Sequence, residues 1–106
     1  MRRQQYKLDN LDLKVLRMED FDLGDVYLLS ADLSQTNLVG ADLCGAFCLY
    51  VKMRKTILSK SILWGSYLFA ADLRGAIFIE ADIWEADLTG ADISDAIFSK
   101  IKNFQV

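Results

Sequence analysis

The sequence predicts an all-β fold, a single solenoid domain whose coils have four sides of five residues each. The first observation is a repeat, because residues 6–105 divide into twenty consecutive pentads with no insertion or deletion. The second is that the third residue of each pentad, its centre, is apolar in every pentad except the last, and the first residue is apolar in 16 of 20. The third is that none of the 27 charged residues falls on these 40 positions, where random placement would put about ten. Burying unpaired charges is costly, so these positions predict an interior.

The pentad repeat fits short extended segments and excludes an α-helix. Residues five apart on a helix are about 140° out of phase, so a strict pentad would leave no single apolar face. Within a pentad, inward and outward residues alternate as in a strand, and the last two residues must turn the chain. Four such turns close a coil of about 20 residues, and stacked coils lie about 4.8 Å apart. Twenty pentads therefore predict five coils and a rigid rod on the order of 24 Å long.

One motif recurs in these pentads. Ala-Asp-Leu or Ala-Asp-Ile, followed by two variable residues, occupies the pentads that begin at residues 31, 41, 71, 81, 86 and 91. With this motif and the uninterrupted pentads, essentially the whole chain closely resembles the pentapeptide-repeat proteins. The resemblance implies the right-handed quadrilateral β-helix of that family, with the first and third residues pointing inward. It implies no single function, since members range from quinolone-resistance proteins that bind DNA gyrase to regulators of cyanobacterial development.

The ends of the solenoid need covering, because an open coil exposes apolar side chains and unpaired backbone groups. Bulky first positions at the N-terminal end predict side chains that fold over and plug the opening, and these are Tyr6, Leu11, Leu16, Phe21 and Val26. From Ala71 to Ala96 the same position is always Ala. Near the C-terminus Asn103 stands at a centre, so the segment 101–106 is expected to slip out of register.

These boundaries divide the chain into three parts. We expect an N-terminal leader over residues 1–5 and the β-helix over residues 6–100. Residues 101–106 are expected to form either a short cap or an end that another subunit covers, and we favour the cap because its apolar side chains could fold over a small cross-section.

Catalytic and metal chemistry find little support in the composition. The chain has no His, which is the commonest general base and metal ligand. Cys48 stands at a centre and Cys44 at an outward position, so their opposite orientations argue against a mutual disulfide. The aspartates recur as part of the repeat, and no nucleophile or glycine loop interrupts it. The sequence therefore predicts no catalytic residue, cofactor, metal ion or small-molecule substrate, and a protein that is not an enzyme.

Charge and hydropathy also limit the partners and the location. A net charge of −3 with a pI near 4.8 argues against nucleic acid as a partner. A polar residue interrupts the chain every few positions, whereas a membrane span needs about 20 apolar residues. No apolar segment typical of an export signal follows the first five residues, so we expect a cytoplasmic protein.

One side of the coil carries an apolar surface, because residues 20 apart stack into outward columns. This aromatic side has its centres at Leu8, Leu28, Cys48, Leu68 and Leu88. Its large side chains are either a ladder that stabilises the strands, at about 0.2 to 1 kcal/mol per contact, or a contact surface rimmed by charge. We favour the contact surface, because two apolar columns exposed together exceed what a ladder requires. The candidate interface residues are Tyr27, Leu29, Phe47, Leu49, Tyr50, Tyr67 and Phe69.

The next two sides have weaker signals. On the isoleucine side, centred on residues 18, 38, 58, 78 and 98, the column Ile57, Ile77 and Ile97 is interpreted as a strand ladder in preference to an interface. On the tryptophan side, centred on residues 23, 43, 63 and 83, Trp64 stacks on Trp84, and self-packing is favoured over gripping a ligand.

The remaining, charged side has its centres at residues 13, 33, 53, 73 and 93. Its second positions are Asp12, Asp32, Lys52, Asp72 and Asp92. Like charges about 4.8 Å apart in water repel by about 0.9 kcal/mol. Lys52, Arg54 and Arg74 should therefore relieve the aspartate column.

Taken together, these features predict a non-enzymatic protein-interaction module. It would be a rigid solenoid that contacts a protein partner or a second copy through the aromatic side. The alternative, which the resemblance implies, is an inhibitor or protector of DNA gyrase that acts through an acidic surface. The basic residues on the charged side weaken that alternative, because they interrupt the acidic column.

Overall fold

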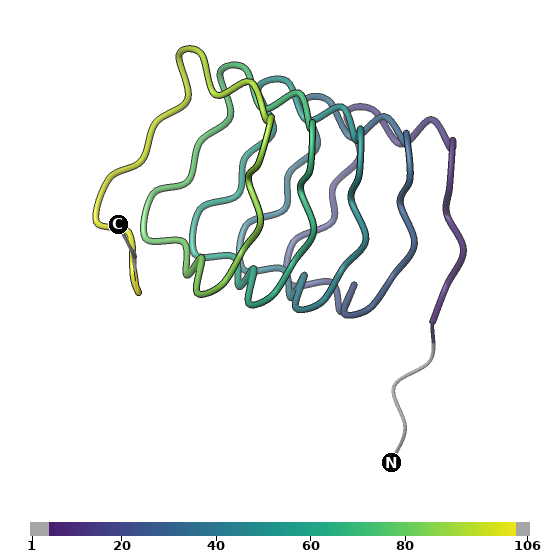
Figure 1. Ribbon diagram of the computed structural model, residues 1–106, viewed down its shortest axis with the longest axis horizontal. Helices are drawn as coiled ribbons and strands as arrows, with labels where there is room; N and C mark the ends of the chain where they lie inside the picture. Colours follow the sequence, from purple (N-terminus) through teal and green to yellow (C-terminus); the bar gives the residue numbers. More distant parts are fainter. Residues whose placement is uncertain (1–4, 104–106) are drawn as a thin grey trace.

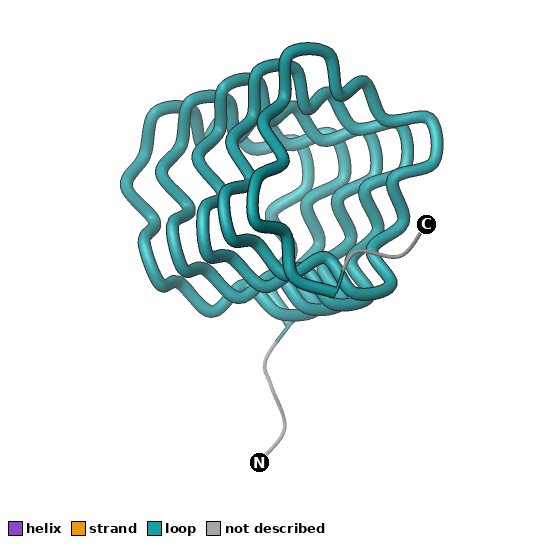
Figure 2. Tube along the Cα trace, turned by 90° about the vertical axis from the view of Figure 1, so that its left-hand side faces the viewer, coloured by secondary structure: helices purple, strands orange, loops and turns teal. Residues whose placement is uncertain are grey.

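The computed structural model describes residues 5–103, which form the predicted four-sided β-helix. Successive coils stack along one axis, from the purple N-terminal coil to the yellow C-terminal coil (Figure 1). Turned by 90°, the coils follow one another with the same bends in each layer (Figure 2). The Cα extents are 30 × 28 × 25 Å, so the stack of coils is about as wide as it is long. Residues 1–4 of the predicted leader and 104–106 of the predicted cap lie outside the described residues.

Backbone hydrogen bonds join each coil to the next in a fixed register. The amide of Leu28, a centre, donates to the carbonyl of Phe47, a second position in the next coil, at 2.8 Å. The amide of Phe47 donates back to the carbonyl of Val26 at 2.8 Å, and the fifth-position amide of Ser30 donates to Leu49 at 3.0 Å. Second positions twenty residues apart consequently form single parallel bridges, such as Tyr27 with Phe47. The extended segments are this short because each side has only five residues.

The corners depend on a left-handed backbone conformation. Every fifth position from Asn10 to Lys100 has a φ between 54° and 71°. Each corner also has a turn hydrogen bond from a first-position amide to the preceding centre, such as Val51 to Cys48 at 3.2 Å. Within residues 5–103 the chain forms no helix that is long and apolar enough to span a membrane.

The core runs up the middle of the block. From Val26 to Ala81 every first and third position is at most 1% exposed, as the pentad pattern predicted. Four of these buried residues are polar, namely Thr36, Thr56, Ser61 and Ser66. The hydroxyls of Thr36 and Thr56 both donate to the carbonyl of Leu33, at 2.6 and 2.7 Å. Shared carbonyls of this kind let hydroxyls replace alanine in the core without losing hydrogen bonds.

The N-terminal coil is covered less well than expected. Its four bulky first positions remain between 44% and 51% exposed, and they are Tyr6, Leu11, Leu16 and Phe21. Two of its centres, Met18 and Leu23, are nevertheless only 6% exposed, whereas Leu8 and Leu13 are half-buried. The bulky side chains thus plug the opening only in part, because no described coil covers them from below, whereas the same positions are buried from Val26 to Ala81.

The C-terminal end keeps its register longer than the sequence suggested. Lys102 still bridges to Asp82, and its amide donates to the carbonyl of Ala81 at 2.9 Å. At Asn103 the backbone turns, with a φ of 56° at what would be a centre. The side-chain amide of Asn103 donates to both carboxylate oxygens of Asp82 at 2.9 Å, which ties this end to the coil below.

Candidate functional site

A column of stacked rings forms the middle of the aromatic side. The rings of Tyr27 and Phe47 lie 4.9 Å apart at 19°, and those of Phe47 and Tyr67 lie 5.0 Å apart at 4°. Parallel bridges between these second positions set the spacing, since the coils repeat at the separation of paired strands. At the adjoining corner, Tyr50 meets Phe69 edge to face at 5.9 Å and 86°. The structure therefore places the predicted aromatic residues in a three-ring column and a neighbouring two-ring contact.

The exposure of this surface is uneven. Tyr50 is 53% exposed, Tyr67 45%, Leu29 43% and Phe69 38%. Tyr27, Phe47 and Leu49 are half-buried. Around the ring column lie Lys7 and Asp87, which bridge to Tyr27 and Tyr67 and so end the apolar column with charged residues.

The aromatic residues, like the other second positions without Asp or Asn, lack a turn hydrogen bond to their side chains. Where the second position is Asp or Asn, its side chain accepts a hydrogen bond from the amide two residues on, as Asp32 does from Ser34 at 3.0 Å and Asp42 from Cys44 at 2.9 Å. Such Asx turns satisfy a donor that the coil register leaves without a partner. Tyr27, Phe47 and Tyr67 have no such acceptor to offer.

The backbone amides two residues after the rings differ in whether they have a hydrogen-bond acceptor. The amide of Leu29 donates to the carboxylate of Asp9 in the coil below, at 2.8 Å. For the amides of Leu49 and Phe69, no described residue provides an acceptor. The aromatic side thus combines apolar rings with two backbone donors that a partner could use.

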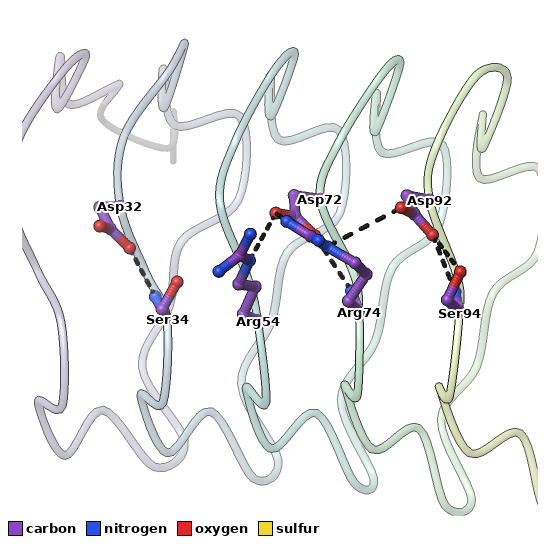
Figure 3. Close-up of polar contacts among 7 residues, drawn as sticks. All are labelled: Asp32, Ser34, Arg54, Asp72, Arg74, Asp92 and Ser94. Carbon is purple, nitrogen blue, oxygen red and sulfur yellow. Dashed lines mark hydrogen bonds and ion pairs between the residues drawn. The ribbon is translucent and has the colours of Figure 1, made fainter.

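The charged side forms a network of ion pairs instead of an acidic surface. Asp72 accepts from Arg54 at 2.9 Å and from Arg74 at 2.7 Å, and Arg74 also lies 3.8 Å from Asp92 (Figure 3). The predicted relief of the aspartate column by Arg54 and Arg74 is confirmed by these contacts. Asp72 is the member that both arginines hold, so its charge is the most fully compensated.

Hydrogen bonds help to lower the pKa of two other aspartates on this side, Asp32 and Asp92. For Asp32, burial works against the charged form, but hydrogen bonds from Ser34 and the charges of Lys14 and Lys52 outweigh it and lower the pKa. For Asp92, hydrogen bonds from the hydroxyl and amide of Ser94 lower the pKa. These carboxylates act as turn acceptors, which is a structural use and not an acid–base one.

Sequence comparison identifies the family of this fold. The sequence model of pentapeptide repeats matches residues 22–65 and 66–102, with eight copies. The chain belongs to the pentapeptide-repeat proteins. No curated protein matches it by sequence.

Solved structures of other pentapeptide-repeat proteins share the right-handed β-helix. Rfr23 from the cyanobacterium Cyanothece 51142 matches with a TM-score of 0.75 at 21% identity, over 91% of this chain and 86% of its own. Trypsin-treated QnrB1, a plasmid-mediated fluoroquinolone resistance protein, matches with 0.77 at 18% identity, over 89% and 47%. HetL from Nostoc sp. strain PCC 7120, involved in heterocyst differentiation regulation, matches with 0.50 at 30% identity, over 85% and 48%. The chain spans about half the length of QnrB1 and HetL.

This pentapeptide-repeat protein has one surface feature that the sequence analysis missed. A shallow hollow of about 480 Å³ lies on the charged side, and its basic lining residues are Lys14, Lys52, Arg54 and Lys55. Asp32 and Asp72 also line it, and Asp72 pairs with Arg54. The signal in the sequence was Lys52, the one basic residue in a column of aspartates, next to the corner residue Lys55.

The remaining candidate residues lie as follows. Trp64 and Trp84 pack against each other, as expected, and meet edge to face at 5.9 Å and 81°. A bare contact between two rings at right angles leaves no slot between them for a flat ligand. Cys48 is buried and Cys44 half-buried, and no disulfide joins them. Among residues 5–103, acidic and cysteine side chains do not gather in threes as a metal site would need.

Proposed function

We propose that this protein is a non-enzymatic interaction module that contacts a protein partner or a second copy through its aromatic side. Pentapeptide-repeat proteins are generally structural or interaction modules. The observation that carries the proposal is the column of stacked rings beside the exposed side chains of Leu29 and Phe69, to which the amides of Leu49 and Phe69 add two donors without an acceptor among the described residues. The isoleucine side has similar amides at Ser59 and Ile79 but no ring column.

The chemistry of this surface favours a protein over other partners. Rings and aliphatic side chains at the middle with charged residues at the margin resemble the anatomy of a protein interface. Backbone donors between the two apolar columns could bond the carbonyls of an extended segment, as in strand addition. In the cytoplasm, the expected location, such a segment could belong to another protein or to a second copy.

The test compares two sides of the same coils. Phe47→Asp with Tyr67→Asp places two charges in the ring column, and Ile57→Asp with Ile77→Asp places them at the equivalent second positions of the isoleucine side. We expect the wild type, as bait in extracts of its source cells, to retain a partner that the first variant loses and the second keeps. Light scattering on each purified protein would detect a second copy as that partner. Retention of every partner and of the wild-type mass by the first variant would reduce the aromatic side to a ladder.

A second candidate is an inhibitor or protector of DNA gyrase, which the fold similarity to QnrB1 favours. The ion pairs of Asp72 with Arg54 and Arg74 count against it, because they neutralise the surface that would have to be acidic. A DNA-supercoiling assay with gyrase decides the matter. This candidate predicts altered supercoiling at micromolar protein, and unchanged supercoiling would exclude it at that concentration.

A further inference from the structure

We propose that the N-terminal end of the β-helix binds a second copy of the same chain, end to end, about a two-fold axis. This surface is separate from the aromatic side and independent of the function proposed for it. Three observations on the first coil support the proposal, and they concern its apolar corners, its backbone edge and the order of its charges.

The first observation is the exposed apolar surface at the corners. Val15 is 65% exposed, and Tyr6, Phe21, Leu16 and Leu11 are between 44% and 51% exposed. The first position of the pentad is alanine from Ala71 to Ala96, so the largest side chains at this position are concentrated in the first coil. The two shorter extents of 28 and 25 Å bound a cross-section of up to about 700 Å². That area is close to the ~800 Å² which each partner buries in an interface of standard size.

The second observation is an unsatisfied backbone edge. In the stack, each second-position amide donates to the coil below, as Phe47 does to Val26, and each second- and fourth-position carbonyl accepts from that coil. For the amides of Lys7, Asp12 and Arg17, no described residue provides an acceptor. The edge offers donors and acceptors together, which is what a strand edge needs in order to pair with a copy of itself.

The third observation is the order of charges around the first coil. Each of its first three sides has one basic and one acidic residue flanking the centre, with the order reversed on the middle side. The pairs are Lys7 and Asp9, then Asp12 and Lys14, then Arg17 and Glu19. These residues are exposed except for Glu19, which is half-buried, and the side chain of Arg17 is 85% exposed.

This order is self-complementary about particular axes. A two-fold axis lying in the end plane reverses the direction of the second chain, so a second position faces a fourth position. The axis can pass through the middles of two opposite sides, and each basic residue then faces an acidic one. If it crosses the sides of Leu8 and Met18, Lys7 faces Asp9 of the other copy and Arg17 faces Glu19. If it crosses the other two sides, Lys7 faces Glu19 and Arg17 faces Asp9. If it passes through corners, like charges meet, such as Lys7 with Lys14. The charges therefore favour an axis through the middles of opposite sides and disfavour an axis through corners.

The opposite end of the molecule lacks this pattern. The last coil has Asp87 and Asp92 at second positions, followed by Thr89 and Ser94, so neither side carries both charges. Stacking the first coil of one copy on the last coil of another in the native register would place Asp12 against Asp92, but also Lys7 against Asp87 and Asp22 against Lys102. The paired charges on the sides of the first coil are matched only by another first coil, which favours a closed pair through the N-terminal ends.

The test uses two variants of the full chain that cannot pair with themselves but can pair with each other. Lys7→Glu with Arg17→Glu makes these two sides wholly acidic, and Asp9→Lys with Glu19→Lys makes them wholly basic. Sedimentation velocity should show a wild-type dimer that weakens as salt is added, because exposed ion pairs are screened. The dimer dissociation constant of each variant alone should be at least about tenfold higher than that of the wild type, because the ion pairs become repulsions. An equimolar mixture of the two variants should regain the dimer. The regained dimer also shows that both variants are folded.

A matched apolar pair completes the experiment. Leu16 and Tyr67 are 46% and 45% exposed, on the N-terminal end and on the aromatic side. Leu16→Asp should abolish the dimer and Tyr67→Asp should leave it intact, whereas partner binding through the aromatic side should respond in the opposite way. A wild type that is monomeric throughout, variants that dimerise like the wild type, or a dimer lost with Tyr67→Asp alone would each overturn the proposal.

Discussion

The first coil and the middle coils are built from the same pentads, yet only the middle coils exclude water from the whole of their interiors. At the centre Leu28 the side chain is 0% exposed, whereas Leu8, one coil below on the same side, is half-buried. The difference arises from neighbours, because each coil of a solenoid buries its interior against the coils on either side. The side chain that a position requires therefore depends on how many coils cover it as well as on its place in the pentad.

The largest expected effect comes from truncating these two leucines. Leu28→Ala should lower the free energy of unfolding by about 2–5 kcal/mol, because it leaves a cavity between two covering coils. Leu8→Ala should cost no more than about 1.5 kcal/mol, because part of the side chain is already in water. Urea denaturation followed by circular dichroism measures both. Equal losses would mean that the first coil is as well packed as the second, and that the contrast between them has no energetic weight.

A pH titration sharpens the same contrast at a single thiol. Complete burial raises the pKa of Cys48 from its ordinary value of 9.0 to about 12, because the thiolate cannot be solvated in the core. Above pH 9 the unfolded chain loses this proton and the folded chain keeps it, so the contribution to stability falls by about 1.4 kcal/mol per pH unit. That contribution is intact below pH 9 and is lost as the pH rises toward 12.

The control for this slope is the difference between matched chains. Stability measured from pH 8 to pH 10 should fall more steeply for the wild type than for Cys48→Ala. Adding Leu8→Cys to Cys48→Ala places a thiol at the half-buried centre of the first coil, and should restore only part of the slope. Identical slopes in all three chains would contradict the burial argument.

Two buried serines test whether the middle coils tolerate polar groups only when these are bonded. Ser61 donates to the carbonyl of Leu58 at 2.6 Å, whereas the hydroxyl of Ser66 has no partner among the described residues. Ser66 stands between Ala46 and Ala86 in its column, so alanine fits there. Ser66→Ala should stabilise the protein by about 1 kcal/mol, and Ser61→Ala should destabilise it by a similar amount. Thermal denaturation of the two variants, compared with the wild type, would show shifts of opposite sign, and shifts of the same sign would refute the distinction.

Much of this architecture could be predicted from the repeat alone. The pentads located the interior at Leu28, Cys48 and Leu68 because a period of five admits only one inward pattern. They also aligned Tyr27, Phe47 and Tyr67, because residues twenty apart must stack. Regularity makes such predictions exact, since one repeat determines the environment of the next.

The parts that could not be predicted depend on side-chain conformations or on missing neighbours. The perpendicular contact of Trp64 with Trp84 is a rotamer choice that column position does not determine. The closure of Asn103 onto Asp82 replaces a regular pentad and follows no repeat. The exposure of Tyr6 and Phe21 depends on how far corner side chains reach across an open end. Which outer column contacts a partner likewise depends on chemistry outside this chain.

The smallest expected effect concerns the first coil, at the corner residue Val15. Its φ of 58° lies in the left-handed region, which β-branched side chains rarely adopt. It is also 65% exposed, so little packing compensates for this strain. Val15→Asn should raise the free energy of unfolding by about 0.5–1 kcal/mol, because Asn tolerates this conformation better. The middle-coil corner Gly65 already has a φ of 62° with no atom within 4 Å of an added Cβ, so Gly65→Val should cost at least as much as Val15→Asn gains. Chemical denaturation of both variants measures the two effects. If Val15→Asn instead weakens the protein or its self-association, Val15 is retained for the contact that its side chain makes at the N-terminal end.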